Sequence, residues 1–201
     1  MISLPVSIDT EQIKTQRLDL SYPTVSQLHD KNIEQQINYE ILMTVQRMLQ
    51  KQGFYENPLT EITASYEIKT NERGILSLTL INYAYSGGAH GMTIIEGLTF
   101  DVTTGKRYKL SELFQKNSNY VEKISEIVKN QIEERDLFLL EPPFKGISPE
   151  QDYYIADKAL VLFFQLYELT AYAYGFPYFP ISIYDLQTII DEQGPLGKMF
   201  G

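Results

Sequence analysis

The spacing of apolar residues changes along this chain, and that change constrains the fold more than any other feature. Between residues 26 and 51, apolar side chains recur at steps of three to five positions. This period predicts one face of a long amphipathic helix, and Gly53 is expected to end it. After residue 61 the period becomes two, which predicts strands. Long helices separated by groups of such strands favour an α+β fold.

The strands expected after this helix form a meander. Residues 62–68 alternate, "NERG" at 71–74 predicts a hairpin turn, and a second strand follows to about Tyr85. Residues 92–101 are the third strand, and "TTGK" at 103–106 predicts the turn that closes it. Consecutive strands joined by short turns pair antiparallel.

Further elements are expected on either side of the meander. Residues 13–22 alternate well enough for a strand, which Pro23 is expected to stop. Ser111 is a candidate cap for a second amphipathic helix, whose apolar side runs from Tyr120 to Ile132. The elements expected after that helix are a strand, a tight turn "ADK" at 156–158, a central strand over 159–166, a last strand over 178–183 and a short closing helix over 184–192.

Together these elements predict a single α+β domain over residues 1–201. Its antiparallel sheet consists of the meander, a C-terminal hairpin and a further strand, with two long helices packed mainly on one face. Residues 100–110 are the candidate seam if the chain instead forms two sub-units, 1–100 and 101–201.

Charge and composition exclude several classes of function. The chain carries a net charge of −9 and no cysteine among its 201 residues. An acidic chain repels nucleic acid, because phosphate binding needs clustered Lys and Arg. The lack of cysteine excludes disulfides and thiolate metal sites. Two histidines far apart, His29 and His90, are too few for a zinc site with nearby ligands. We therefore expect no metal and no cofactor.

No segment of the sequence reads as a membrane span or a targeting signal. No run reaches the roughly 18 apolar residues of a membrane helix. The N-terminus, "MISLPVSIDTEQIK", lacks the basic and apolar regions of a signal peptide. Two alternatives stay open, a cytoplasmic protein and an extracytoplasmic protein whose leader has been removed.

The segment "SGGAHG" at 86–91 places His90 and three glycines between two expected strands. A phosphate-binding loop is disfavoured, because such a loop leads into a helix and here a strand follows. Ser86 and His90 are four positions apart, but acyl transfer also needs a third group and an oxyanion hole. We interpret the glycines as sites of positive φ and close backbone approach, with His90 hydrogen-bonded locally. The alternative is that the loop forms a binding surface.

The segment "YELTAYAYGFPYFP" at 167–180 is rich in aromatic residues. Its tyrosines and phenylalanines either fill the core or form an exposed recognition patch, because they supply large apolar area in both settings. Glu168 lies between a buried apolar run and these aromatics, and we expect it to be partly buried. It is a candidate acceptor for N–H groups of the loop, and the alternative is a catalytic carboxylate.

Five short elements occur in this order along the sequence: "YAYSGGAHG" at 83–91, "TGK" at 104–106, "LSELF" at 110–114, "YE" at 167–168 and "AYAYG" at 171–175. With them the chain resembles, over residues 13–190, a known family of extracytoplasmic domains, those of the lysozyme-sensing anti-sigma factor RsiV and the peptidoglycan deacetylase PdaC. The parts that signal or deacetylate in those proteins have no counterpart in this sequence, so the resemblance implies the fold and a recognition role at the cell envelope.

We therefore predict a non-catalytic binding module of the cell envelope, and no enzyme. The expected ligand is a basic protein such as lysozyme, which the net charge of −9 favours, or a cell-wall glycan. The alternatives are a cell-wall hydrolase that uses Glu168 or His90 and a cytoplasmic structural protein. The residues expected to form the binding surface are Tyr83, Tyr85, His90, Glu168, Tyr172, Tyr174 and Phe176.

Overall fold

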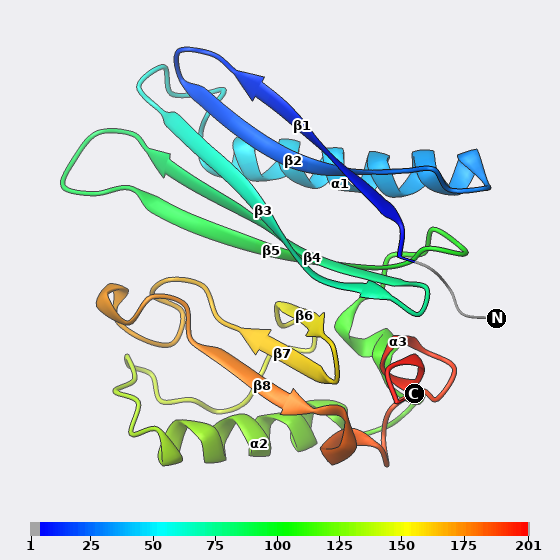
Figure 1. Cartoon of the computed structure of the whole chain (residues 1–201). Helices are drawn as coiled ribbons and strands as arrows, with labels where there is room; N and C mark the ends of the chain where they lie inside the picture. Colours follow the sequence, from blue (N-terminus) through cyan, green and yellow to red (C-terminus); the bar gives the residue numbers. More distant parts are fainter. Residues whose placement is uncertain (1–4, 201) are drawn as a thin grey trace. The chain divides into compact units, whose positions relative to one another are not determined.

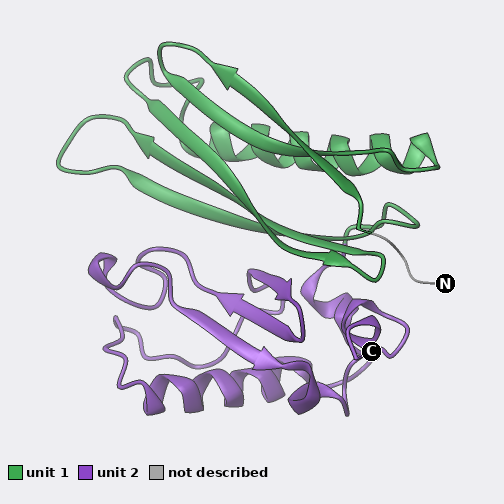
Figure 2. Ribbon diagram, viewed as in Figure 1, with its two compact units in different colours: residues 1–107 green, residues 108–201 purple. Residues whose placement is uncertain are grey.

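The computed structural model describes residues 5–200 and divides the chain into two compact units, residues 1–107 and residues 108–201 (Figures 1 and 2). Each unit contains its own sheet and its own long helix. The N-terminal stretch considered as a signal peptide begins at residues 1–4, which lie outside the described residues. Over residues 5–200, no helix has both the length and the apolar character needed to cross a membrane.

Unit 1 combines one long helix with a five-stranded sheet. Its elements are β1 (Ser7–Lys14), β2 (Leu18–Ser26), α1 (Lys31–Lys51), β3 (Glu61–Glu72), β4 (Ile75–Tyr85) and β5 (Met92–Asp101). The strands lie in the order β1-β2-β3-β4-β5, and β3, β4 and β5 form the expected antiparallel meander. β1 and β2 form an antiparallel hairpin, whereas β2 and β3 pair in parallel because α1 connects them.

Helix α1 covers this sheet with the apolar stripe that the spacing predicted. Ile37, Ile41 and Met48 are fully buried in one core with strand residues such as Leu78. Burial of each of these side chains contributes about 1.5–3 kcal/mol. Gly53 follows the end of the helix with a φ of 73°, as expected.

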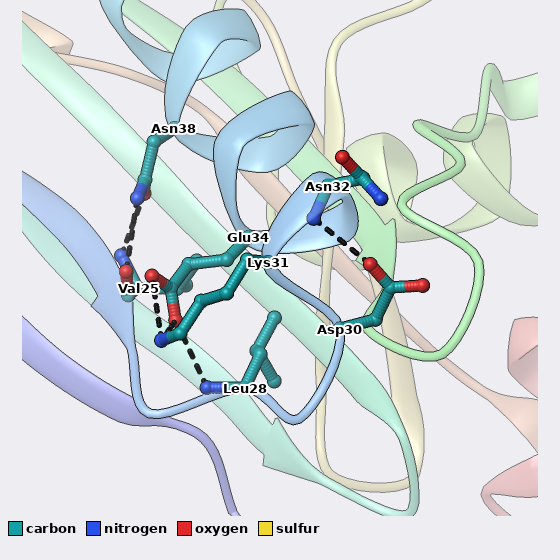
Figure 3. Close-up of polar contacts among 7 residues, drawn as sticks. All are labelled: Val25, Leu28, Asp30, Lys31, Asn32, Glu34 and Asn38. Carbon is teal, nitrogen blue, oxygen red and sulfur yellow. Dashed lines mark hydrogen bonds and ion pairs between the residues drawn. The ribbon is translucent and has the colours of Figure 1, made fainter.

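The helix begins at Lys31, not at residue 26 as the spacing predicted. Gln27 interrupts the chain before it with a φ of 62°, in the left-handed region. Asp30 is the N-cap, and its side chain accepts a hydrogen bond from Asn32 N at 2.8 Å (Figure 3). A cap and a left-handed residue therefore set the start of α1, and apolar spacing alone does not reveal either.

Glu34 ties the same turn to the chain that precedes it (Figure 3). Its carboxylate accepts hydrogen bonds from Leu28 N at 3.0 Å and from Lys31 Nζ at 2.8 Å. The bond from Lys31 holds the pKa of Glu34 below its usual value. The start of α1 is therefore held by an ionised carboxylate.

The prediction that Pro23 stops a strand over 13–22 is wrong, since Pro23 lies inside β2. Proline has no backbone N–H and is tolerated where no ladder bond is needed. β2 pairs with β3 only as far as Leu20. Beyond it the side-chain amide of Asn38 takes the place of a strand, accepting from Val25 N at 2.7 Å and donating to Val25 O at 2.9 Å (Figure 3). The nitrogen of Pro23, two positions from Val25, faces the same unpaired edge.

The two turns predicted around the meander are confirmed. Arg73 and Gly74 have φ values of 53° and 77° and join β3 to β4 as a two-residue loop. After β5, the carboxylate of Asp101 accepts a hydrogen bond from Thr103 N at 2.8 Å, and Gly105 has a φ of 74°. The Asp101 side chain and the positive φ of Gly105 thus form the turn that follows the meander.

Unit 2 combines a second long helix with a three-stranded antiparallel sheet. Its elements are the 3-10 helix η1 (Leu110–Leu113), α2 (Tyr120–Glu134), β6 (Tyr153–Ala156), β7 (Ala159–Phe163), η2 (Tyr172–Tyr174), β8 (Tyr178–Ser182), η3 (Ile183–Leu186) and α3 (Pro195–Lys198). β7 is the central strand, as predicted. Ser111 lies inside η1 and does not cap α2, because the chain turns at Asn117, with a φ of 64°, before α2 begins.

The closing helix expected over 184–192 is wrong, since η3 and a series of turns occupy this range. The backbone here bonds to another part of unit 2. Gln115 N donates to Ile189 O at 2.8 Å, and Asp191 N donates to Leu113 O at 3.1 Å. These tertiary bonds satisfy the groups that helical bonds would otherwise use.

The α+β fold is confirmed, with its antiparallel meander, its C-terminal hairpin and further strand, and its two long helices. The strands are divided between two sheets, one in each unit.

Candidate functional site

The residues expected to bind a ligand occupy two loops, one in each unit. The β4–β5 loop covers residues 86–91 of unit 1, and the aromatic loop covers residues 164–177 of unit 2, between β7 and β8. Tyr83, Tyr85 and His90 belong to the β4–β5 loop and the strand end before it, whereas Glu168, Tyr172, Tyr174 and Phe176 belong to the aromatic loop.

Glycine geometry shapes the β4–β5 loop, as interpreted from the sequence. Gly87 and Gly88 have φ values of 91° and 106°, in the region that favours glycine. The Tyr85 hydroxyl donates to Gly88 O at 3.0 Å and closes the loop onto the end of β4. His90 Nδ1 lies 2.8 Å from Gly91 O, so the histidine is hydrogen-bonded within the loop.

Gly91 lets two parts of this hairpin approach each other closely. A Cβ atom at this position would lie 2.4 Å from Ala84 O and 2.5 Å from Cζ of Tyr83. Both distances are well inside van der Waals contact, so only glycine fits beside the ring of Tyr83. Tyr83 and Tyr85 alternate along β4, and 39% and 37% of their surfaces are exposed on one face of the strand.

A neighbouring loop adds apolar surface that the sequence reasoning missed. Ser86 Oγ lies 2.8 Å from Thr60 Oγ1, which joins the β4–β5 loop to the end of residues 53–60. In that range Tyr55 is 62% exposed and Leu59 is 70% exposed. Nothing in the spacing of these residues indicates that they lie near the glycines, because strand pairing brings them together.

The first two acidic residues that follow His90 in the sequence make structural contacts. Glu96 forms an ion pair with Arg47 at 3.0 Å, and Asp101 holds the turn after β5. Within residues 5–200, no three His, Asp or Glu side chains gather closely enough to share a metal ion. The arrangement around His90 is that of a shaped loop with an exposed face.

Glu168 holds the start of the aromatic loop together. Its carboxylate accepts hydrogen bonds from Gln165 N at 2.7 Å and from Gln151 Nε2 at 3.4 Å. Gln151 is buried and also donates to Phe163 O at 2.9 Å. The predicted role of Glu168 as an acceptor for a loop N–H group is confirmed. The expectation that Glu168 is partly buried is wrong, because Glu168 is exposed and follows Tyr167, which has a φ of 65°.

The aromatic residues of this segment divide between core and surface. Phe163, Phe164 and Phe179 are buried, whereas Tyr167 is 48% exposed and Tyr174 is 53% exposed. The segment therefore contributes both to the core and to the surface, and a recognition role of its exposed rings stays a prediction. A hydroxyl that needs water or a hydrogen-bond partner explains this division.

Two tyrosine rings of the aromatic loop are adjacent. The ring centroids of Tyr167 and Tyr172 are 5.6 Å apart, and their planes are tilted by 35°. η2 and Gly175, with a φ of 70°, then turn the chain toward β8. Tyr172 and Phe176 are half-buried at the base of the loop.

Phe138 lies in another segment of unit 2 that runs beside the aromatic loop. Leu139 forms a β-bridge with Thr170, so the chain that follows α2 runs beside the aromatic loop. Phe138 is 72% exposed. Sequence spacing carries no signal for this contact between distant segments. We call the aromatic surface the set Phe138, Tyr167, Glu168, Tyr172 and Tyr174.

Two family models match the chain, one in each unit. A model described as "Deacetylase PdaC" matches residues 9–93, which include the β4–β5 loop. A model described as "Protein of unknown function (DUF3298)" matches residues 111–184, which include the aromatic loop. Both candidate loops therefore lie inside the matched regions.

One named protein and two crystal structures are similar to this chain. The peptidoglycan-N-acetylmuramic acid deacetylase PdaC of Bacillus subtilis strain 168 is 25% identical over 142 residues, which are 66% of this chain and 30% of that protein. The match thus spans less than a third of the relative's length. A crystal structure of a DUF3298 family member from Bacteroides fragilis has a TM-score of 0.73 at 12% identity, covering 97% of both chains. A DUF3298 family protein from Pseudomonas aeruginosa has a TM-score of 0.72 at 15% identity, covering 98% of this chain and 97% of its own.

The crystal structures show the fold alone, whereas the family models and the deacetylase match extend to the sequence. The resemblance to PdaC is thereby confirmed, and the resemblance to RsiV stays a prediction. The chain thus resembles PdaC over residues 9–93 and DUF3298 proteins over residues 111–184.

Proposed function

We propose that this chain is a non-catalytic binding module of the bacterial cell envelope and that its ligand is a cell-wall glycan. The observation that carries this proposal is the aromatic surface of unit 2. Tyrosines that are about half exposed stand there on a loop held by hydrogen bonds of Glu168 and Gln151.

The chemistry of this surface suits a saccharide. Aromatic rings pack against the C–H face of a pyranose, and tyrosine hydroxyls pair with sugar hydroxyls. The rings of Tyr167 and Tyr172 are already adjacent in the protein, so little ordering is required when a ligand binds. An open loop of this kind favours an extended polymer over a small molecule that needs a deep pocket.

The relationship to PdaC supports the choice of glycan. The name of that relative refers to a deacetylase of peptidoglycan, and a module that shares part of its sequence is reasonably placed outside the cytoplasm, on the same polymer. Deacetylation itself does not transfer with the match, because the match spans only 30% of the relative.

Lysozyme is the second candidate ligand. The net charge of −9 favours binding of a basic protein, since opposite charge speeds the encounter. The cell-wall hydrolase that would use Glu168 or His90 is the enzymatic alternative. The hydrogen bonds of Glu168 to Gln165 and Gln151 argue for a structural role instead. Release of reducing ends from peptidoglycan distinguishes a hydrolase from a binding module.

Calorimetric titration with soluble peptidoglycan fragments, with N-acetylglucosamine oligomers and with lysozyme tests the proposal. We expect the wild type to bind glycan, and Tyr174→Ala to weaken that binding about three- to tenfold. Tyr184→Ala is the matched control, because Tyr184 is 50% exposed elsewhere in unit 2. His90→Ala tests the β4–β5 loop as a second contact. The proposal is overturned if the wild type binds no glycan, or if Tyr174→Ala and Tyr184→Ala lose equal affinity.

A further inference from the structure

We infer that the aromatic surface recognises an ammonium group, so that its glycan ligand carries free, unacetylated amines. This inference rests on the proposed function and narrows it to one class of saccharide. It follows from the charge, the contacts and the ring geometry of the segments that form the surface.

The segments that form the aromatic surface contain three acids, and two bases border them. Residues 136–144 contain Asp136 and Glu141, and residues 164–180 contain Glu168. Arg135 and Lys145 lie at the two ends of the first range, and Arg135 Nη1 donates to Tyr178 O at 2.8 Å. The acids are therefore in excess by one charge, which favours a cationic ligand within a Debye length, about 8–10 Å at physiological salt.

The charge of Glu168 is not neutralised by a neighbouring base. In the described part of the chain its carboxylate accepts hydrogen bonds from the neutral amides of Gln165 and Gln151, and it takes part in no ion pair. These bonds fix the group in position without cancelling its charge, and Glu168 is exposed. A fixed, exposed carboxylate is suited to pair with a cationic group of a ligand.

Tyrosine rings stand beside this carboxylate in the chain. Tyr167 directly precedes Glu168, and its ring centroid is 5.6 Å from that of Tyr172. Aromatic faces attract ammonium groups through their quadrupole, contributing about 0.5–1 kcal/mol at exposed sites. A carboxylate together with tyrosine faces distinguishes a glucosamine amine from its acetamide, because acetylation removes the charge and leaves the rest of the sugar unchanged.

The test compares two probes of equal length, a chitosan pentamer with free amines and the fully N-acetylated chitin pentamer. We expect the wild-type chain to bind the chitosan pentamer about fivefold more tightly at low salt. Because the preference is electrostatic, we expect most of it to disappear in 0.5 M salt. This salt dependence needs no substitution and is therefore independent of any effect on folding.

Glu168→Gln removes the charge and keeps an oxygen that accepts from Gln165 N. Because the tyrosine faces remain, we expect this variant to keep only about a twofold preference for the chitosan pentamer, with its affinity for the acetylated pentamer unchanged. Glu126→Gln is the control, since Glu126 is an exposed acid on α2, and we expect it to keep the preference.

Equal affinity of the wild type for the two pentamers, or a preference as large in Glu168→Gln as in the wild type, overturns this inference and leaves the proposed function intact. Lack of binding to either pentamer and to peptidoglycan fragments overturns the proposed function and this inference with it.

Discussion

The two candidate loops are built by different means. The β4–β5 loop of unit 1 depends on backbone geometry, with Gly87 and Gly88 at positive φ and Gly91 at a point where a Cβ does not fit. The aromatic loop of unit 2 depends on side chains, since Glu168 and Gln151 hold it by hydrogen bonds. Glycines fix a shape and contribute no chemistry of their own, whereas the carboxylate both fixes a shape and presents a charge. Under the proposed function, we therefore expect the primary contact with a ligand in unit 2.

Substitution of Gly91 is expected to have the largest effect, because the new side chain meets backbone. Gly91→Val places Cβ within 2.4 Å of Ala84 O, and we expect the free energy of unfolding of unit 1 to fall by about 3 kcal/mol. Gly87→Ala is the matched control. Its Cβ would meet nothing within 4 Å, so only the positive φ opposes it, at a cost of about 1 kcal/mol.

Urea unfolding of both variants measures this difference. If Gly87→Ala lowers the free energy of unfolding as much as Gly91→Val does, close approach at Gly91 is not what fixes the β4–β5 loop. The contrast drawn between the two loops would then be wrong for unit 1.

Removal of the Glu168 carboxylate is expected to have an intermediate effect. Glu168→Ala leaves Gln165 N and Gln151 Nε2 without this acceptor, and we expect a loss of about 1 kcal/mol in the free energy of unfolding. Glu168→Gln keeps an acceptor and is expected to lose less than half as much. A more direct readout is hydrogen exchange at Gln165 N, which should speed up in the alanine variant. Unchanged exchange there contradicts the role given to Glu168.

The smallest effect is expected from lowering the pH, which protonates Glu34, the carboxylate that holds the start of α1. The hydrogen bond from Lys31 lowers the pKa of Glu34. A carboxylate with a lowered folded pKa stabilises the protein above its usual value of 4.5, and this contribution is lost as the pH falls through the folded value. The stability gap between the wild type and Glu34→Gln should therefore be present at pH 7 and close below pH 4.5. A difference in unfolding free energy that grows as the pH falls would contradict the role given to Glu34.

Periodicity was sufficient to predict the elements whose apolar residues pack in a regular pattern. Ile37, Ile41 and Met48 follow the helical period and are buried, and the meander follows the period of two. The predictions are wrong where a side chain from a distant position pairs with the backbone. Pro23 sits inside a strand because the amide of Asn38 replaces a neighbouring strand at that edge. Such partners come from distant positions, so local spacing does not reveal them.

The candidate site shows the same limit. The conformational role of the glycines and the acceptor role of Glu168 followed from residue type and position. Phe138 did not, because only the bridge between Leu139 and Thr170 brings it to the aromatic loop. The positive φ of Tyr167 was not predicted either, because it is unusual for a residue other than glycine.

Hydrogen–deuterium exchange of the wild-type chain, with and without a saturating chitosan pentamer, tests the central claim most directly, because it locates the ligand. We predict slower exchange in residues 164–177 and in the segment around Phe138, which together form the aromatic surface. Protection confined to the β4–β5 loop, or no protection anywhere in unit 2, contradicts the claim that this surface is where the protein binds.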